Sequence, residues 1–521
     1  MIGRMPTEIR HLQRAMPADH AACYAALVAR DRRFDGRLYV GVTSTGIYCR
    51  PVCSVRTPKA ANCRFFEHAA AAEAGGFRPC LRCRPELAPG LAGIDMPSRL
   101  AWAAAQRIEA GALDDGGLVG LAARLGITDR HLRRIFVDVF GVTPIDYAQT
   151  QRLLSAKRLL ADTALPVTEV ALAAGFGSLR RFNDLFRSRY QLTPGEMRRA
   201  SSPAARSGGL HFELAFRPPL DWPRLLAFLA ARCVAGVEAV ADGHYRRSVR
   251  LFNAGTEHTG WLALSLAGCG HAVALDVAPG LLRVLPAVLA GVRRLCDLSC
   301  DPQAVAAGLG PLAADAPGLR VPGAFDGFEM AVRAVLGQQV TVKAAHTLAG
   351  RFVAAFGDAL QPPAPFAGVD ALFPTAQRVA ALSGEEIGAL GIVRSRAHAL
   401  VALAQAVVDG RVDLGPAAHV DDCIARLQSL PGIGPWTAQY IALRALGWPD
   451  AWPSGDVALI KALGAASPRE ADALADAWRP WRSYATVHLW RRLAEAAPVP
   501  VAGDQRDDPR PAPGEPPVRP A

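Results

Sequence analysis

The chain has 521 residues, of which 51% are hydrophobic and 20% are charged. This length allows three or four domains, because single cores stop growing near about 250–300 residues, and the hydrophobic content excludes general disorder. No apolar stretch has the length of a membrane span or a signal peptide, and eleven cysteines are an odd number for a secreted disulfide scaffold. We therefore expect a cytoplasmic protein. Its net charge of +11 favours a polyanionic partner.

Composition breaks divide the chain into four units. Helical periodicity dominates residues 98–200, LHFELAFR alternates like a strand from Leu210, and helical periodicity returns from about Phe325. Small and polar residues fill the stretch between the second and third units. The predicted units and connections are 15–88, 98–200, a linker at 201–209, 210–320, 321–500 and an unfolded tail at 503–521.

The first unit contains two closely spaced cysteine pairs. Cys49 and Cys53 form a CxxxC pair, and Cys80 and Cys83 form a CxxC pair 27 residues further on. Two short chelates separated by a loop are a common way to build a tetrahedral zinc site. The alternative is four structural thiols without a metal. Cys63, between the pairs, is expected to be a core thiol.

A zinc site of this kind can do more than hold a fold together. Zinc keeps thiolates deprotonated and therefore nucleophilic at neutral pH. Alkylation of one sulfur removes one negative charge, which would strengthen attraction to nearby DNA phosphates. Arg50 and Arg82 lie beside the cysteines and add positive charge there.

The stretch from TSTGIYCRPVC to GFRPCLRCRPE resembles the metal-binding domain of the Ada methylation-response family. The resemblance implies irreversible transfer of a methyl group from a DNA methylphosphotriester to a zinc-bound cysteine. Cys49 matches the acceptor of the family's (F/Y)CRPxC motif, and Cys53, Cys80 and Cys83 match the other ligands. The family's PCHR motif for O6-methylguanine repair is absent from this sequence, so we expect no such activity.

The second unit contains an internal repeat of two helix-turn-helix patterns. The first has a turn at Gly126 and a second helix from about Thr128, and the second has a turn at 175–177 with Ser178 as the expected N-cap. Basic residues near the start of each second helix are placed where a recognition helix meets DNA. They are Arg130, His131, Arg133, Arg134, Arg180 and Arg181. A single basic face of this kind is more often a solvated surface.

The second repeat, GFGSLRRFNDLFRSRYQLTP, resembles the AraC-type DNA-binding domain. The resemblance implies transcriptional control, with the two recognition helices in successive major grooves. Double-stranded DNA and RNA polymerase are therefore the expected partners.

The last unit contains a glycine turn followed by an isolated carboxylate. In LPGIG, Gly432 and Gly434 can present free N–H groups to a phosphate at the start of a helix. A helix–helix turn without a ligand is the alternative. Asp456 lies 22 residues after Gly434. A carboxylate at such a site can stabilise an oxocarbenium-like transition state and position water.

This combination resembles the helix-hairpin-helix (HhH-GPD) DNA glycosylases, and most of 210–495 resembles the 3-methyladenine DNA glycosylase II (AlkA) family. The resemblance implies that Asp456 is the catalytic carboxylate. Bifunctional relatives have a lysine after the motif's proline, whereas this chain has Trp436. Lys461, the nearest lysine, is expected to contact phosphate. We therefore predict a monofunctional enzyme that needs no cofactor, uses water as the nucleophile and leaves an abasic site.

The substrate is expected to be an N-alkylated base, because a cationic, electron-poor base stacks well on electron-rich rings and departs readily. By resemblance, the pocket for the flipped base contains Phe228, Trp436, Tyr440 and Trp490. Gln338 and Gln339 lie where the family inserts a wedge into the duplex. Core packing is the alternative for each aromatic residue, and Trp448 and Trp452 are assigned to packing.

The sequence thus predicts a multidomain α+β protein. Its expected parts are a small zinc-binding α/β domain, an all-α double helix-turn-helix domain, an α+β subdomain and an all-α helix-hairpin-helix domain. We expect a monomeric, bacterial, nucleoid-associated protein with one zinc ion. Two alternatives remain: a transcription factor whose C-terminal half only binds DNA, and a repair enzyme whose N-terminal half only tethers it to DNA.

Overall fold

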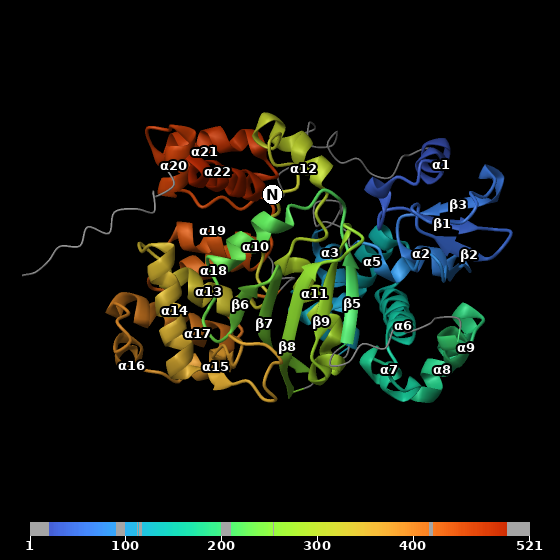
Figure 1. Ribbon diagram of the computed structural model, residues 1–521, viewed down its shortest axis with the longest axis horizontal. Helices are drawn as coiled ribbons and strands as arrows, with labels where there is room; N and C mark the ends of the chain where they lie inside the picture. The colour runs from blue at the N-terminus through green and yellow to red at the C-terminus, as the bar shows by residue number, and fades with distance from the viewer. Residues whose placement is uncertain are drawn as a thin grey trace, which may run out of the picture.

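The computed structural model has the multidomain α+β architecture that the sequence predicts (Figure 1). The residues that it describes are 20–89, 99–111, 113, 117–199, 210–253, 255–415 and 420–496. The predicted linker 201–209, the predicted tail 503–521 and the start of the 15–88 unit lie outside them. Among the described residues, no helix is long and apolar enough to cross a membrane.

A four-stranded sheet forms the centre of the first domain, in the order β3-β1-β2-β4. Its elements are α1 (His20–Val28), β1 (Tyr39–Val42), β2 (Ile47–Cys49), β3 (Cys63–Phe66), α2 (Ala69–Ala74) and β4 (Arg78–Pro79). Strands β2 and β4 run parallel, and Tyr48 is paired with Pro79. Because Cys49 and Cys80 each follow one of these paired residues, the parallel pairing brings the two cysteines to the same edge of the sheet.

The second domain is helical throughout its described residues, as predicted. Its helices are α3 (Arg99–Glu109), α4 (Gly117–Arg124), α5 (Asp129–Phe140), α6 (Pro144–Asp162), α7 (Val167–Ala173), α8 (Leu179–Tyr190) and α9 (Pro194–Arg199). In α5, the buried residues Leu132, Phe136 and Phe140 recur every four positions. In α8, a buried aromatic residue recurs with the same period. This spacing gives each helix one apolar face and leaves its arginines on the opposite face.

A five-stranded antiparallel sheet, in the order β5-β9-β8-β7-β6, begins the C-terminal half. Its strands are β5 (Leu210–Ala215), β6 (Glu238–Ala241), β7 (His244–Asn253), β8 (Thr256–Leu266) and β9 (Ala272–Val277). The helices of this region are α10 (Trp222–Ala230), α11 (Leu285–Leu295) and α12 (Pro302–Leu309). The alternation in LHFELAFR therefore gives the strand that the sequence predicts.

Helices dominate the rest of the C-terminal half. They are α13 (Gly327–Leu336), α14 (Val342–Phe356), α15 (Ala376–Ala380), α16 (Gly384–Gly388), α17 (Arg394–Val408), α18 (Val420–Gln428), α19 (Pro435–Arg444), α20 (Val457–Leu463), α21 (Pro468–Ala475) and α22 (Arg482–Ala496). A short strand pair, β10 (Asp358–Ala359) with β11 (Ala371–Leu372), departs from the all-α expectation. The helical core also takes in α12, whose Val305 and Leu309 are buried in it.

The domains pack directly against one another. One hydrophobic core runs without a break from the second helix-turn-helix unit into the five-stranded sheet. At this junction the Arg158 guanidinium lies 5.1 Å from the ring centroid of Phe212 and donates a hydrogen bond to the carbonyl oxygen of Glu213. Arg37 of the first domain forms an ion pair with Asp301 at the start of α12. The N-terminal domains are therefore docked onto the C-terminal half.

Candidate functional site

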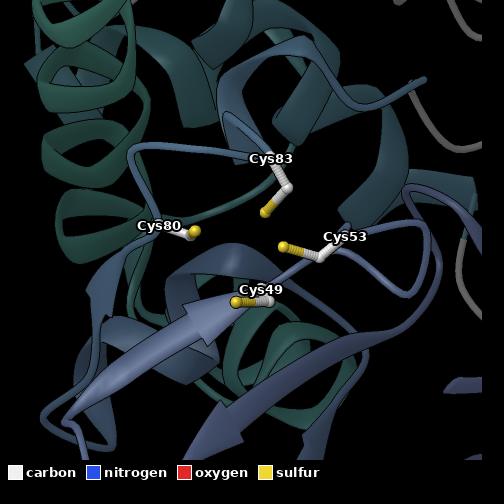
Figure 2. A group of neighbouring side chains, drawn as sticks. All are labelled: Cys49, Cys53, Cys80 and Cys83. Atoms are coloured by element: carbon white, nitrogen blue, oxygen red, sulfur yellow. The ribbon is translucent and has the colours of Figure 1, made fainter. Parts of the chain in front are cut away.

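The four predicted zinc ligands converge at one edge of the small sheet (Figure 2). Cys49 ends β2, Cys53 lies in the following turn, Cys80 follows β4, and Cys83 lies in the turn after it. The four Sγ atoms all lie within 4.8 Å of one another. Zinc–sulfur bonds of about 2.3 Å in a tetrahedron need sulfur–sulfur separations in this range. The donor set and its spacing therefore fit one zinc ion.

The four thiols of the cluster hydrogen-bond to one another, and these bonds shift their pKa values in opposite directions. Hydrogen bonds from Cys49, Cys53 and Cys83 hold the pKa of Cys80 well below its usual value, whereas hydrogen bonds with the other three thiols raise the pKa of Cys49. The backbone N–H of Arg50 also donates to the Sγ of Cys83, at 3.3 Å. Three of the cysteines are buried, and only Cys83 is half-buried. Such a site holds negative charge away from water, which a bound cation would neutralise.

Arg50 does not have the role that its position in the sequence suggested. Its guanidinium is buried, pairs with Asp35 through a 2.7 Å hydrogen bond from Nε, and donates to the carbonyl oxygen of Cys83. It therefore fixes the metal-binding loop and is not available to DNA. Arg82 is exposed. Cys63 is a core thiol, as predicted, and lies outside the metal-binding group.

The two predicted recognition helices are α5 and α8. The side chain of Thr128 caps α5 by accepting from the His131 N–H, and that of Ser178 caps α8 by accepting from the Arg181 N–H. The Ser178 cap therefore lies where the sequence predicts it, and α5 begins at the predicted position near Thr128. Arg130, Arg133, Arg134, Arg180 and Arg181 are exposed, and His131 is half-buried. The helix starts thus present a basic surface on each unit, which suits contact with DNA.

The LPGIG turn joins α18 to α19. Gly432 has φ of +78°, and an added Cβ would lie 2.9 Å from the Cβ of Ala399. Glycine is required there for both its backbone conformation and its close packing. Gly434 is the N-cap of α19 and has open space around it, so its end of the helix can approach a phosphate.

The two predicted wedge residues differ in their surroundings. The Nε2 of Gln338 donates to the carbonyl oxygen of Gly432 at 2.9 Å and to the Oγ1 of Thr437 at 3.0 Å. Gln338 therefore ties the end of α13 to the hairpin. Gln339 is exposed and has φ of +52°, a left-handed conformation that non-glycine residues rarely adopt. Of the two predicted wedge residues, Gln339 is the exposed one, in the loop between α13 and α14.

Asp456 is the N-cap of α20, and three N–H groups surround its carboxylate. Its Oδ1 accepts from the Leu459 backbone at 3.0 Å and from the Trp490 indole at 3.3 Å. Its Oδ2 accepts from the Trp436 indole at 2.9 Å. Three donors at fixed positions hold this carboxylate in one orientation.

Three of the four predicted pocket aromatics form a continuous group beside this carboxylate. The rings of Trp436 and Tyr440 stack with centroids 5.2 Å apart and an angle of 7°. Tyr440 and Trp490 are 6.2 Å apart and tilted by 50°. All three are half-buried, so part of each ring remains accessible. The stack can therefore receive a flat, electron-poor ring next to Asp456.

Phe228 lies against cationic groups. The guanidinium carbon of Arg232 is 3.8 Å from its ring centroid, and that of Arg444 is 4.8 Å away. Arg444 also donates to the hydroxyl oxygen of Tyr440 at 2.8 Å. Burial alone would raise the pKa of Tyr440, but the charges of Arg444, Arg232 and Arg333 lower it below its usual value. Two arginines thus connect Phe228 to the aromatic stack.

Sequence reasoning missed these two arginines and the indole hydrogen bonds. Arg444 lies four residues after Tyr440, one helical turn away, and this spacing was an available signal. Arg232 likewise lies four residues after Phe228, so the same spacing marks this contact. Trp452 is buried and donates to Asp472, as suits the packing role predicted for it, and Trp448 packs against the helical core. Lys461 is exposed near the end of α20.

Four parts of the chain match known protein families. The matches are the metal-binding domain of Ada over 22–86, a helix-turn-helix domain over 121–200, the AlkA N-terminal domain over 211–326 and the HhH-GPD superfamily of base excision DNA repair proteins over 332–476. Their order is the order that the sequence predicts. None of these matches is an O6-methylguanine repair domain.

Curated relatives match most of the chain or parts of it. A probable bifunctional transcriptional activator/DNA repair enzyme AlkA of Mycobacterium tuberculosis is 40% identical over 92% of this chain and 97% of that protein. DNA-3-methyladenine glycosylase 2 of Escherichia coli is 39% identical over 54% of this chain and 96% of that protein. The transcriptional activator/DNA repair enzyme Ada of Escherichia coli is 32% identical over 29% of this chain and 42% of that protein. The chain therefore belongs to the family of bifunctional transcriptional activator/DNA repair enzymes that join an Ada-type metal-binding domain and a helix-turn-helix domain to an AlkA-type glycosylase.

Proposed function

We propose that the C-terminal half excises N-alkylated bases of the 3-methyladenine type from DNA. The observation that carries this proposal is the position of the Asp456 carboxylate, held by the Trp436 and Trp490 indoles beside the Trp436–Tyr440 stack. The stacked rings bind the flipped, electron-poor base. As the glycosidic bond breaks, its electron pair leaves with the base, and Asp456 stabilises the positive charge that develops on the sugar.

Water completes the reaction. It adds its oxygen to the anomeric carbon, Asp456 accepts the proton, and an abasic site remains. Trp436 occupies the place of the lysine in bifunctional relatives, and the side chain of Lys461 is exposed further along α20. No Schiff base is therefore expected. Borohydride should trap no covalent adduct between this protein and alkylated DNA.

The test is base release from N-methylated duplex DNA by the full chain and by Asp456→Asn. This substitution keeps the shape of the N-cap and removes the charge, so we expect release to fall by about 100-fold or more. Asp472→Asn is the matched control, because Asp472 also accepts an indole hydrogen bond but lies with Trp452 outside the aromatic stack. Equal activity of Asp456→Asn and the unmodified protein would favour a C-terminal half that only binds DNA.

We propose further that the N-terminal domain accepts methyl groups from methylphosphotriesters. Zinc bound by Cys49, Cys53, Cys80 and Cys83 would keep these sulfurs deprotonated. The Sγ of Cys49 forms a bond to the methyl carbon, the carbon–oxygen bond breaks, and its electron pair returns to the phosphate oxygen as a diester. Mass spectrometry should find one added methyl on the peptide containing Cys49. Cys49→Ser should acquire none, whereas methyl on the Cys83 peptide would reassign the acceptor.

We infer that the helix-turn-helix units direct the methylated protein to promoters. The exposed basic residues at the starts of α5 and α8 support contact with DNA. RNA polymerase is the expected partner, and the protein is expected to act as a monomer on DNA in the bacterial cytoplasm. Footprinting with the protein before and after methylation should show protection of two successive major grooves.

A further inference from the structure

A single buried carboxylate connects three elements of the two N-terminal domains. Glu73, on α2, exposes only 4% of its surface. Its Oε1 accepts from the Tyr48 hydroxyl at 3.2 Å and the Tyr190 hydroxyl at 3.3 Å, and its Oε2 accepts from the Thr150 hydroxyl at 3.1 Å. All three donors are also buried. These oxygen–oxygen distances are longer than the usual value of about 2.5–3.0 Å, so the three hydrogen bonds orient the buried carboxylate without holding it tightly.

One of these connections, through Tyr48, leads directly to the metal site. Tyr48 immediately precedes Cys49 in β2, and its carbonyl oxygen accepts from the Cys80 backbone N–H at 3.0 Å. Strand β4, which ends just before Cys80, pairs with β2 and contacts α8. The cysteines at this edge of the sheet are therefore connected to Glu73 through Tyr48.

The other connections lead to the DNA-binding helices. Tyr190 is the last residue of α8, the second recognition helix. Thr150 lies on α6, the long helix between the two helix-turn-helix units. The side chain of Glu73 thus lies between the metal-binding strands and the helix that presents Arg180 and Arg181.

We propose that Glu73 is a positioning residue that transmits a change at the Cys49 metal site to the second recognition helix. Its trigger in the cell rests on the methyl transfer proposed above. When Cys49 gains a methyl group, the site loses one negative charge and one sulfur becomes larger. The strand pair β2–β4 then adjusts, and the Tyr48–Glu73–Tyr190 hydrogen bonds pass this adjustment to α8.

The proposal differs from a switch that works by charge alone. Loss of a negative charge near DNA strengthens attraction to phosphate whether or not any helix moves. If hydrogen bonds carry the change, the contacts of Glu73 must differ between the protein with unmethylated Cys49 and the protein with methylated Cys49. Removal of these hydrogen bonds should then leave α8 unaffected by a change at the metal site. The two mechanisms therefore predict different results when the hydroxyl of Tyr190 is removed.

The experiment measures amide hydrogen exchange in the full zinc-loaded chain. Cys49 is methylated with a methylphosphotriester oligonucleotide, the DNA is removed, and the added methyl is confirmed by mass. Methylation should change the exchange rate of the α8 amides by about threefold or more. In Tyr190→Phe and in Glu73→Gln this change should be lost. A second arm compares zinc-loaded protein with protein treated with a chelator, and it should show the same dependence on Tyr190 and Glu73.

Tyr147→Phe is the matched control. Tyr147 is a buried tyrosine on α6 whose hydroxyl donates to Glu109 at 2.6 Å, outside the Glu73 group. This variant should keep the full response in α8. An α8 that does not respond to methylation or metal removal, or that responds equally in all variants, overturns the proposal. If no methyl group is added, the methyl-transfer proposal fails, and the chelator arm alone decides the role of Glu73.

Discussion

The indole Nε1 of Trp436 lies 2.9 Å from Oδ2 of Asp456, so one side chain both stacks on Tyr440 and donates to the carboxylate. Trp490 makes a longer hydrogen bond to the other oxygen. Trp436 and Trp490, two of the residues that we propose bind the flipped base, therefore do more than stack. They also fix where the negative charge lies, and a carboxylate that is already oriented stabilises a developing cation without further rearrangement.

Trp436→Phe tests this dual role. Phenylalanine keeps a ring that can stack on Tyr440 but cannot donate to Asp456. Loss of one charge-assisted hydrogen bond is worth about 1.5–3 kcal/mol, so we expect single-turnover base release to slow by roughly 10-fold to 100-fold. Trp452→Phe removes an indole hydrogen bond to Asp472 and should leave the rate unchanged. If base release by Trp436→Phe is as fast as in the unmodified protein, Trp436 acts only by stacking.

Metal removal tests the cysteine site. Without zinc, four sulfurs held within 4.8 Å of one another lose the charge that keeps them together. A chelator should therefore make Cys49, Cys53, Cys80 and Cys83 reactive toward a thiol reagent and lower the melting temperature of the chain. The core thiol Cys63 serves as the internal reference and should react only on unfolding. A thiol count that is the same with and without chelator would contradict a bound metal.

Glu73 should make folding stability depend on pH. Burial raises the pKa of Glu73 to about 7, although its hydrogen bonds from Thr150, Tyr48 and Tyr190 and the charge of Arg189 oppose this. Because the folded state then binds more protons than the unfolded state, stability should fall as pH rises from about 4.5 to about 7. In the Glu73→Gln variant this loss of stability with rising pH should be absent.

The measurement is the free energy of unfolding in denaturant at pH 5 and at pH 8, for both proteins. The variant should gain stability relative to the unmodified chain as the pH rises. A difference between the two proteins that stays constant across this range would mean that Glu73 does not titrate there.

The sequence predicts those features of the site that depend on residues close together in the chain. The cysteine pairs, the cap at Ser178, the helix start near Thr128 and the glycines of the hairpin depend on residues a few positions apart, and short-range geometry fixes them. The family resemblance then identifies Asp456 and the aromatic residues. Elements with a strong period, such as α5, α8 and β5, are predicted for the same reason.

Local sequence patterns do not predict the contacts between domains. Glu73 meets Tyr190, 117 positions away, and Arg158 meets Phe212 across the predicted linker. Arg50 shows the same limit, because its neighbours in sequence are the zinc cysteines while its guanidinium pairs with Asp35. In each case a charged or polar residue is buried by a partner that no local pattern specifies. Strands β10 and β11 likewise have too few residues to show an alternation of hydrophobic and polar side chains.

Gln339→Ala tests the residue that we propose as the duplex wedge. Gln339 is exposed on a strained backbone between α13 and α14, whereas Gln338 is held by the hairpin. A flipped base leaves a gap in the stack, and a side chain that fills it offsets part of the unstacking free energy of a few kcal/mol. We expect Gln339→Ala to slow base release from duplex DNA by about 10-fold and to leave release from single-stranded DNA unchanged, because no gap forms there. Gln338→Ala should instead weaken binding of any duplex, since it loosens the Gly432 turn. Equal losses on both substrates in Gln339→Ala would place this residue outside the wedge.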